Sequence, residues 1–454
     1  YLNQKIIFEY RKHLPKSLLN MYMAHNYTFF LKNNSSHLLK NIVTETSNVI
    51  TGCVAMIMGL VSDVMLASLA IISLLFFDFN TTIFIGVFLF LIIFLYLFFS
   101  RKIVHSTSQN RTYFDTYNFQ AISNIFDNIK VIKILSNENY FSKYFENANN
   151  DWAKSHLKFN IVAQLPRILL EFILVIAIIF TTIVFLADKN PDIVYLMALY
   201  VLVAIRLIPL LSKIVSAVQN LKFNLPALNI LYKEFCSIDK HTNNSDVGKN
   251  HNIKLKNFIK FENVSFAHSA NSETILENIS LKIEKNDFIG VIGETGSGKS
   301  TFVDLLSGLI QPTSGKIIVD NDFIISEKNQ KIWQKNIGYL PQNITVLDGT
   351  IRDNIAFGCN EAEIDNRKIE KVIESAALSD FVAKRPGGIF SEIGQGGKLM
   401  SGGEKQRLAI ARTLYFEPEF LILDECTSSL DVDTEFEILN ILMKLESKTV
   451  VFIT

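Results

Sequence analysis

Cysteine is scarce in this sequence, and neither sign of charge is in excess. The 454 residues include 4 cysteines, with no Cys-x-x-Cys pair and no histidine spacing typical of zinc ligands. This scarcity excludes a disulfide framework or a zinc site as the organising feature of the fold. Lys+Arg and Asp+Glu are equal at 44 each. The balance therefore gives no electrostatic reason to expect nucleic acid as a partner.

Charge itself is scarce in the first half of the chain. Residues 1–235 contain 20 basic and 13 acidic side chains, whereas residues 236–454 contain 24 and 31. The first half has long stretches without any charge, and the second has the charge density of a soluble globular domain. We therefore predict a membrane domain over 1–235, a polar linker over 236–252 and a soluble domain over 253–454.

Four stretches of the first half are apolar and long enough to cross a bilayer, which takes roughly 20 residues in a helix. Apolar residues occupy every helical face of these stretches, which favours membrane spans over the amphipathic helices of a soluble core. The interval 101–160 is rich in Lys and Arg, so the positive-inside tendency places it and the soluble domain in the cytoplasm. Its apolar residues recur at helical spacing, which predicts helices that extend beyond the membrane. The predicted spans are 49–77, 79–100, 161–186 and 193–211.

Charged residues within the spans are costly and are therefore candidates for function. Arg167 and Glu171 stand four residues apart, on one helical face, where they can neutralise each other. Arg206 has no partner at helical spacing. It either contacts a ligand or pairs with Asp63 or Glu171 from another helix.

A phosphate-binding loop is predicted in the soluble half. The strand-like run 288–292 leads into Gly293-x-x-x-x-Gly298-Lys299-Ser300, and a helical stretch follows. Backbone N–H groups of such a loop converge on phosphate oxygens, Lys299 reaches the β and γ phosphates, and Ser300 offers a Mg²⁺ ligand. ATP and Mg²⁺ are therefore the predicted cofactors. The predicted nucleotide contacts here are Gly293, Thr295, Gly296, Ser297, Gly298, Lys299, Ser300 and Thr301.

The run FLILDE, residues 420–425, is a buried-strand pattern that ends in two adjacent acids. Asp424 at the strand end can hold the Mg²⁺ shell, and Glu425 can polarise the attacking water. Two solvated acids after a core strand are the alternative for such a pattern in isolation. The phosphate-binding loop in the same chain favours nucleotide hydrolysis.

The segment MSGGEKQRLAIARTL, residues 400–414, resembles the signature helix of ATP-binding cassette (ABC) transporters. Gln342 in YLPQN is similar to the Q-loop glutamine of that family, and SSLD, which ends at Asp431, to its D-loop. Membrane spans ahead of a cassette resemble an exporter-type half-transporter. The resemblance implies a multi-domain protein, with an all-α polytopic membrane domain followed by an α/β P-loop NTPase nucleotide-binding domain.

The resemblance also implies a dimer in which two cassettes sandwich ATP head to tail. Ser401 and Gly403 of one cassette would contact the γ-phosphate bound at Lys299 of the other. Because one chain has both halves of the composite site, a homodimer is the simpler assembly. The implied catalytic residues are Glu425, Gln342, Ser401, Gly403 and Asp431, and the implied metal ligands are Ser300, Gln342 and Asp424.

The sequence departs from the family pattern at several positions. Met400 and Glu404 replace the usual ends of the Leu-Ser-Gly-Gly-Gln signature, and Gln395 stands where exporters usually have glutamate. His268 occupies the position of the aromatic residue that stacks on adenine. The retained Ser-Gly-Gly core predicts an active ATPase.

The family usually has six spans, and four are visible here. The first 30 residues resemble the cytoplasmic end of a second span, so we expect the missing spans upstream. The switch histidine is expected directly after Thr454. Coupling helices, which dock in the cassettes, are expected near residues 31–41 and 114–125.

Three short stretches, residues 124–134, 165–171 and 201–209, resemble bacterial flippases that translocate lipid-linked oligosaccharides for protein glycosylation. Such a substrate carries a pyrophosphate, which suits an arginine guanidinium. The resemblance thus implies Arg206 and Arg167 as substrate contacts and the bacterial inner membrane as the location. An ABC exporter of peptides or of another lipid is the first alternative, and a non-transporting regulatory ATPase is the second.

Overall fold

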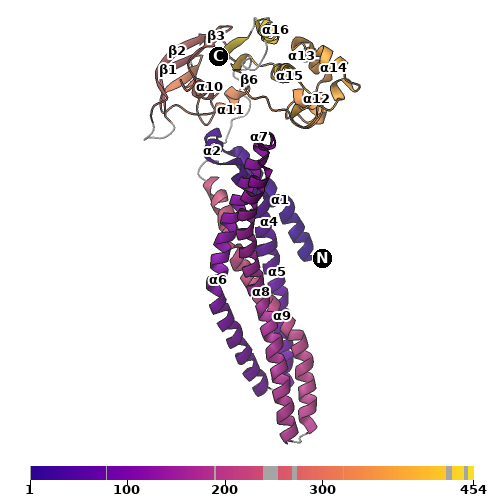
Figure 1. The fold of residues 1–454 in the computed structure, drawn as a ribbon. Helices are drawn as coiled ribbons and strands as arrows, with labels where there is room; N and C mark the ends of the chain where they lie inside the picture. The colour runs from indigo at the N-terminus through magenta and orange to yellow at the C-terminus, as the bar shows by residue number, and fades with distance from the viewer. Residues whose placement is uncertain are drawn as a thin grey trace. The chain divides into compact units, whose positions relative to one another are not determined.

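The computed structural model describes residues 2–77, 79–188, 191–238, 254–267, 273–320, 322–425, 432–443 and 448–454. The chain forms two compact units, one of residues 1–25 and 29–243 and the other of residues 26–28 and 244–454. Over its described residues the first unit is helical, whereas the second combines helices and strands (Figure 1).

Three very long helices run alongside one another in the first unit (Figure 1). They are α6 (Phe79–Asp127), α8 (Glu138–Asp188) and α9 (Pro191–Ile238), of 49, 51 and 48 residues. At about 1.5 Å per residue each is roughly 72–77 Å long, more than twice the ~30 Å hydrocarbon core of a bilayer. Each helix therefore extends well beyond a membrane. The shorter helices are α1 (Leu2–Ala24), α2 (Tyr27–Lys32), α3 (Ser35–Lys40), α4 (Thr46–Val49), α5 (Ala55–Phe77) and α7 (Ile129–Leu135).

Four helical segments of the described chain are long and apolar enough to cross a membrane. Large apolar side chains on this surface point outward, with Phe76, Phe84 and Phe99 exposed by 86%, 75% and 73%. An apolar surface of this extent requires lipid or a protein partner. The segments are Ser35–Phe76, Thr82–Asp127, Glu138–Ile176 and Val201–Cys236.

The two stretches predicted as coupling helices are both helical in the structure. Residues 114–125, where one was predicted, lie inside α6, and the separate short helix between α6 and α8 is α7. The predicted stretch contains no Gly or Pro to end a helix, and the break comes at Asn128, with φ −105° and ψ 14°. Residues 31–41 contain the end of α2 and the whole of α3.

Two π-helical segments interrupt the helical run between α3 and α5. They are η1 (Asn41–Glu45) and η2 (Ile50–Val54). Each wider π-helical turn accommodates an additional residue, and such segments often occur at functional positions. Asn41 and Glu45, at the ends of η1, are completely buried.

A buried charge cluster surrounds η1, and we define it as Lys40, Glu45, Arg111 and Asp115. Lys40 Nζ lies 2.9 Å from Glu45 Oε1, and these side chains are 1% and 0% exposed. Arg111 on α6 lies 3.6 Å from Glu45 and 3.7 Å from Asp115, and it donates a hydrogen bond to Asn224 on α9. Two cations and two anions balance, as the high cost of burying unpaired ions requires.

Two four-stranded sheets organise the described part of the second unit. One is antiparallel, in the order β2-β1-β4-β5, and the other is parallel, in the order β3-β8-β7-β6. The parallel strands all end at one edge of their sheet. The strands are β1 (Phe258–Phe266), β2 (Leu276–Glu284), β3 (Phe288–Val291), β4 (Ser314–Val319), β5 (Phe323–Ile324), β6 (Ile337–Leu340), β7 (Phe420–Asp424) and β8 (Thr449–Ile453). The α-helices are α10 (Lys299–Leu306), α11 (Gln330–Gln334), α12 (Ile351–Ile355), α13 (Asn366–Ser375), α14 (Ser379–Ala383), α15 (Gly402–Tyr415) and α16 (Val432–Met443).

Two hydrophobic clusters stabilise the second unit. One joins α10 to both sheets and contains Phe302, Trp333 and Phe420. The other packs α15 against α12 and α13 and contains Ile355 and Leu408. The helix after the phosphate-binding loop and the signature helix therefore pack into different clusters.

Candidate active site

The phosphate-binding loop connects β3 to α10. Gly298, which precedes α10, has φ 90°, a conformation that side chains rarely adopt. A Cβ on Gly293 would lie 2.6 Å from Ser297 Oγ, so a larger residue there would displace the Ser297 hydroxyl within the loop. Lys299 begins α10, and its Nζ donates a hydrogen bond of 2.6 Å to the carbonyl oxygen of Gly293. The lysine amine thus lies over the loop.

The other predicted nucleotide contacts lie on the same loop and helix start. Thr295, Gly296 and Ser297 are exposed in the loop, while Ser300 and Thr301 lie in the first turn of α10. The first N–H groups of a helix have no intrahelical acceptor and carry a partial positive charge. The loop and helix end are therefore suited to phosphate.

The predicted groups lie at the carboxyl end of the parallel sheet, where β3, β6 and β7 end. We call four of them, Lys299, Gln342, Asp424 and Glu425, the nucleotide edge. Gln342 Nε2 donates a hydrogen bond of 2.6 Å to Glu425 Oε2. Glu425 Oε1 lies 3.7 Å from Lys299 Nζ. Residues predicted from separate motifs are therefore brought together around Glu425.

The backbone of Glu425 has an uncommon conformation. Its φ of 43° is left-handed, and its N–H donates a hydrogen bond of 3.1 Å to the carbonyl oxygen of Ile453 on β8. For a residue with a side chain, this conformation persists only where surrounding contacts enforce it, and it occurs often at active sites. The contact with β8 fixes the direction of the Glu425 side chain.

Asp424 accepts a hydrogen bond from a residue that the sequence motifs did not indicate. Tyr339 Oη on β6 donates to Asp424 Oδ2 at 3.0 Å. Burial raises the pKa of Asp424, and the Tyr339 hydrogen bond opposes this shift. Burial, with the nearby Asp424 charge, also raises the pKa of Tyr339, so its hydroxyl remains a donor at neutral pH. Only the register of β6 with β7 could have indicated this contact.

The nucleotide edge fits a magnesium ion. Ser300, Gln342 and Asp424 offer hydroxyl, amide and carboxylate oxygens, the ligand type that Mg²⁺ prefers. Asp424 is a partly buried carboxylate whose ionised form a cation would stabilise. Few protein ligands are needed, because phosphate oxygens and water complete the usual Mg²⁺ shell.

The signature serine begins α15 as its N-cap. Ser401 N–H donates to Glu404 Oε2 at 2.7 Å, and Glu404 N–H donates to Ser401 Oγ at 3.3 Å. This capping box gives Glu404, a departure from the family pattern, a local role in stabilising the helix start. Gly403 follows within the first turn. Among the described residues, no hydrogen bond joins Ser401 to the phosphate-binding loop.

Two predicted contacts, His268 and Asp431, lie outside the residues that the structure describes, and so does the side chain of Gln395. In the helical unit, Arg167 Nε lies 2.8 Å from Glu171 Oε1, the pair that their spacing predicted. Arg206 is exposed and forms no ion pair within the described part of the chain.

Models of two protein families match most of the chain. The ABC transporter transmembrane region matches residues 1–208, and the ABC transporter model matches residues 276–428. This chain belongs to the ABC transporter family. The transporter is an exporter-type half-transporter and an ATP-hydrolysing translocase, which confirms the fold class and the activity predicted from the sequence.

Two curated relatives and one solved structure are similar to this chain. The chain is 28% identical to an ATP-dependent lipid A-core flippase of Ralstonia nicotianae, over 96% of this chain and 73% of that protein. A putative export ATP-binding/permease protein of Rickettsia conorii is 39% identical over 44% of this chain and 35% of its own length. A solved bacterial Atm1-family ABC exporter with ATP bound has a TM-score of 0.81 at 22% identity, covering 99% of this chain and 78% of that chain. This last similarity shows the shared fold.

Proposed function

We propose that this transporter uses ATP to flip a glycosylated lipid with an anionic head group across the membrane. The observation that carries the proposal is the similarity over 96% of the chain, helical unit included, to a protein named as a flippase of lipid A-core. A lipid-linked oligosaccharide, the substrate predicted from the sequence, is likewise a glycan on a lipid. We propose the bacterial inner membrane as its location.

The nucleotide edge supplies the chemistry of ATP hydrolysis in this proposal. Lys299 binds the β and γ phosphates, and Glu425 orients and polarises the attacking water. Mg²⁺, held by Ser300, Asp424 and Gln342, would neutralise charge on the phosphates. Gln342 and Lys299 both contact Glu425, so a bound phosphate would compete with Glu425 for the Lys299 ammonium group.

Two copies of the chain complete the ATP sites in this proposal. Ser401 and Gly403 start a helix that packs in a different cluster from the phosphate-binding loop. A second copy, arranged head to tail, would bring these residues to the γ-phosphate bound at Lys299. The symmetric homodimer then contains two equal sites.

Arg206 is the substrate contact that we propose on α9. A guanidinium binds phosphate through two parallel hydrogen bonds, and within the described residues Arg206 has no carboxylate partner. Glu171 already neutralises Arg167 at 2.8 Å. Arg206 is therefore the stronger contact of the two.

The test is ATP-driven flipping by the full-length protein in lipid vesicles. Fluorescent glycan protection is measured with a polyprenyl-pyrophosphate oligosaccharide and, separately, with lipid A-core. Protection of either lipid that requires ATP supports the proposal and identifies the lipid. ATP hydrolysis without flipping or stimulation by either would refute it in favour of peptide or other export.

Arg206→Ala sharpens this test. We expect loss of most of the lipid-stimulated ATPase activity, whereas Arg167→Ala retains more of it because Glu171 neutralises Arg167 in the native protein. Equal stimulation of the two variants would remove Arg206 as the substrate contact.

A further inference from the structure

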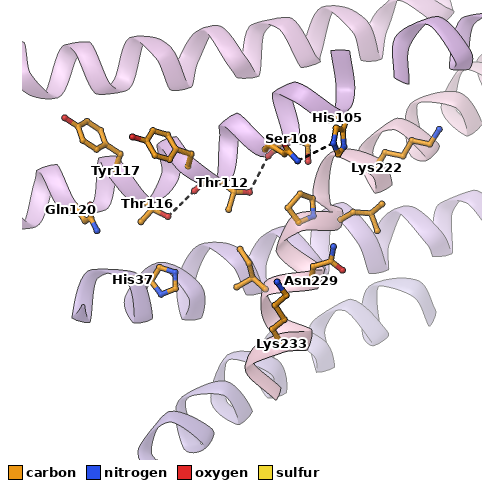
Figure 2. Close-up of a pocket in the computed structure, with 15 residues that line it drawn as sticks. His37, His105, Ser108, Thr112, Thr116, Tyr117, Gln120, Lys222, Asn229 and Lys233 are labelled. Carbon is orange, nitrogen blue, oxygen red and sulfur yellow. Dashed lines mark hydrogen bonds between the residues drawn. The ribbon is translucent and has the colours of Figure 1, made fainter. Parts of the chain in front are cut away.

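A pocket of about 850 Å³ lies within the helical unit, lined by α3, α6 and α9. His37 on α3 and Thr116 on α6 face the same space, which Lys233 on α9 also borders (Figure 2). Neither the ATPase nor the proposed Arg206 contact uses this pocket. Its size is in the range of sites for small organic ligands.

The α6 wall of the pocket is a row of hydrogen-bonding side chains. Ser108, Thr112, Thr116 and Gln120 recur every four residues and so lie along one helical face. Tyr117 adds a phenolic hydroxyl beside them (Figure 2). The hydroxyls of Ser108, Thr112 and Thr116 donate to backbone carbonyl oxygens, so their own oxygens are left as acceptors. Acceptor oxygens in a row, with the Gln120 amide as a donor at the end, match the hydroxyl groups of a sugar.

The α9 wall combines an apolar middle with a cation at each end. Lys222 and Lys233 are eleven residues apart, which places them on nearly the same helical face and about 16 Å apart along the axis. Leu225, Pro226 and Ile230 line the wall between them. A ligand along this wall meets positive charge at both ends and apolar contact between them.

Among the described residues that line the pocket, none has a carboxylate. Two nearby acids are engaged in the buried charge cluster, where Glu45 contacts Lys40 and Arg111. Asp115 accepts a hydrogen bond of 2.7 Å from Trp152 Nε1. The positive charge of the lining therefore remains uncompensated by its own side chains.

The two lysines are available to a ligand. In the described part of the chain, neither Lys222 nor Lys233 forms an ion pair or a hydrogen bond. An ammonium group on a flexible stem binds phosphate as a point charge and needs no fixed geometry. His37 and His105 add two further groups that can donate hydrogen bonds to an anion.

We propose that this pocket binds a phosphate-bearing sugar, with Lys222 and Lys233 contacting phosphate and the α6 side chains contacting sugar hydroxyls. The ligand is the head group of the flipped lipid, so the inference rests on the proposed function and deepens it. The pocket residues belong to the part of the helices that the charge pattern predicts on the cytoplasmic side. The pocket would then receive the head group before translocation.

The test measures binding to the full-length protein without nucleotide, because the proposed site acts before the step that ATP drives. One probe is a polyprenyl-pyrophosphate oligosaccharide in nanodiscs, and the other is soluble glucose 1-phosphate. We expect the combined Lys222→Gln and Lys233→Gln variant to raise Kd about tenfold or more for the probe that binds. Lys213→Gln, an exposed lysine of α9 outside the pocket, should change Kd less than about twofold.

The combined Lys222→Arg and Lys233→Arg variant guards against misfolding, because it keeps both charges and should retain Kd within about threefold. Binding of the lipid probe alone identifies a lipid head group, and binding of glucose 1-phosphate identifies a free sugar phosphate. Equal Kd in the glutamine variant and the native protein, or no binding of either probe, overturns the proposed site. If the native protein flips lipid and the glutamine variant flips it with an unchanged KM, the proposed flippase function stands and the proposed pocket is refuted. If the native protein binds a probe but flips no lipid, the pocket stands and the flippase function is refuted.

Discussion

Two lysine–glutamate pairs in this transporter have the same chemistry and different environments. In the second unit, Lys299 and Glu425 are 3.7 Å apart and 13% and 33% exposed. In the helical unit, Lys40 and Glu45 are 2.9 Å apart and 1% and 0% exposed. The first pair is partly exposed, and its two charged groups are far enough apart for a phosphate to compete with Glu425 for the lysine. The second is closed and desolvated, so no ligand from solvent can compete for either partner.

The comparison shows that burial, more than residue type, separates a pair that can exchange partners from one that cannot. Lys299 also donates a hydrogen bond to a loop carbonyl, and Glu425 accepts one from Gln342, so both can exchange partners. Around Glu45, every charged neighbour is itself buried or nearly so. Removing one partner there leaves the others unpaired in a low-dielectric interior.

Glu425→Gln has the largest expected effect on the open pair. The amide cannot accept the proton of the attacking water, so we expect ATP turnover to fall by about 10²- to 10⁴-fold. ATP binding should persist, because Lys299 and the phosphate-binding loop are unchanged. Turnover and binding of a fluorescent ATP analogue measure the two effects, and undiminished turnover would exclude Glu425 as the base.

Glu45→Gln is the matching change in the closed pair. It leaves Lys40 and Arg111 with one anion, Asp115, and should destabilise the fold by about 3–5 kcal/mol, the usual result of breaking a buried ion pair from one side. Thermal unfolding in detergent measures the loss. An unchanged melting temperature would show that water or another group replaces the carboxylate.

Tyr339→Phe should have a smaller effect at the nucleotide edge. It removes the 3.0 Å hydrogen bond to Asp424, the Mg²⁺ ligand that we propose. Loss of such a contact behind a metal ligand usually costs about 10- to 100-fold in metal affinity or activity. We expect a higher Mg²⁺ requirement for ATPase, with recovery at saturating Mg²⁺. A Mg²⁺ titration equal to that of the native protein would mean that Asp424 keeps its orientation without Tyr339.

Lys133→Gln should have the smallest effect on stability. Its pair with Glu138 is 3.0 Å long and lies outside the predicted spans, with side chains 65% and 46% accessible, and pairs exposed to water contribute little. Melting in the same detergent should not change measurably, in contrast to Glu45→Gln. A loss as large as that of Glu45→Gln would show that the pair is covered in the assembled transporter.

The nucleotide edge was largely predictable from the sequence, because its groups belong to local motifs. The glycine spacing indicated Lys299, and the strand that ends in two acids indicated Asp424 and Glu425. Gln342 was found through the family resemblance. Tyr339 was missed because its contact depends on the parallel register that pairs it with Ile422 on β7.

In the helical unit, the long apolar helices were predictable from the sequence, whereas the polar contacts between helices were not. The pair Arg167–Glu171 follows from spacing within one helix. The buried charge cluster joins positions such as Lys40 and Arg111, which lie on different helices and far apart in the sequence. Residues 114–125, where a coupling helix was predicted, lie within the long helix α6 because they share its helical pattern.

The π-helical segment η1 also has a consequence for the tolerance of this chain to deletions. One residue advances an α-helix by about 100°, so a deletion within a regular helix rotates everything that follows. A π-helical turn holds one additional residue, and removing Ile42, Val43 or Thr44 would let ordinary α-helical hydrogen bonding resume with the flanking helices in nearly their original orientation. The lipid-facing side of α5 would then keep its surroundings. Among homologous sequences, single-residue deletions should therefore be more frequent in this short segment than in the regular turns of α5.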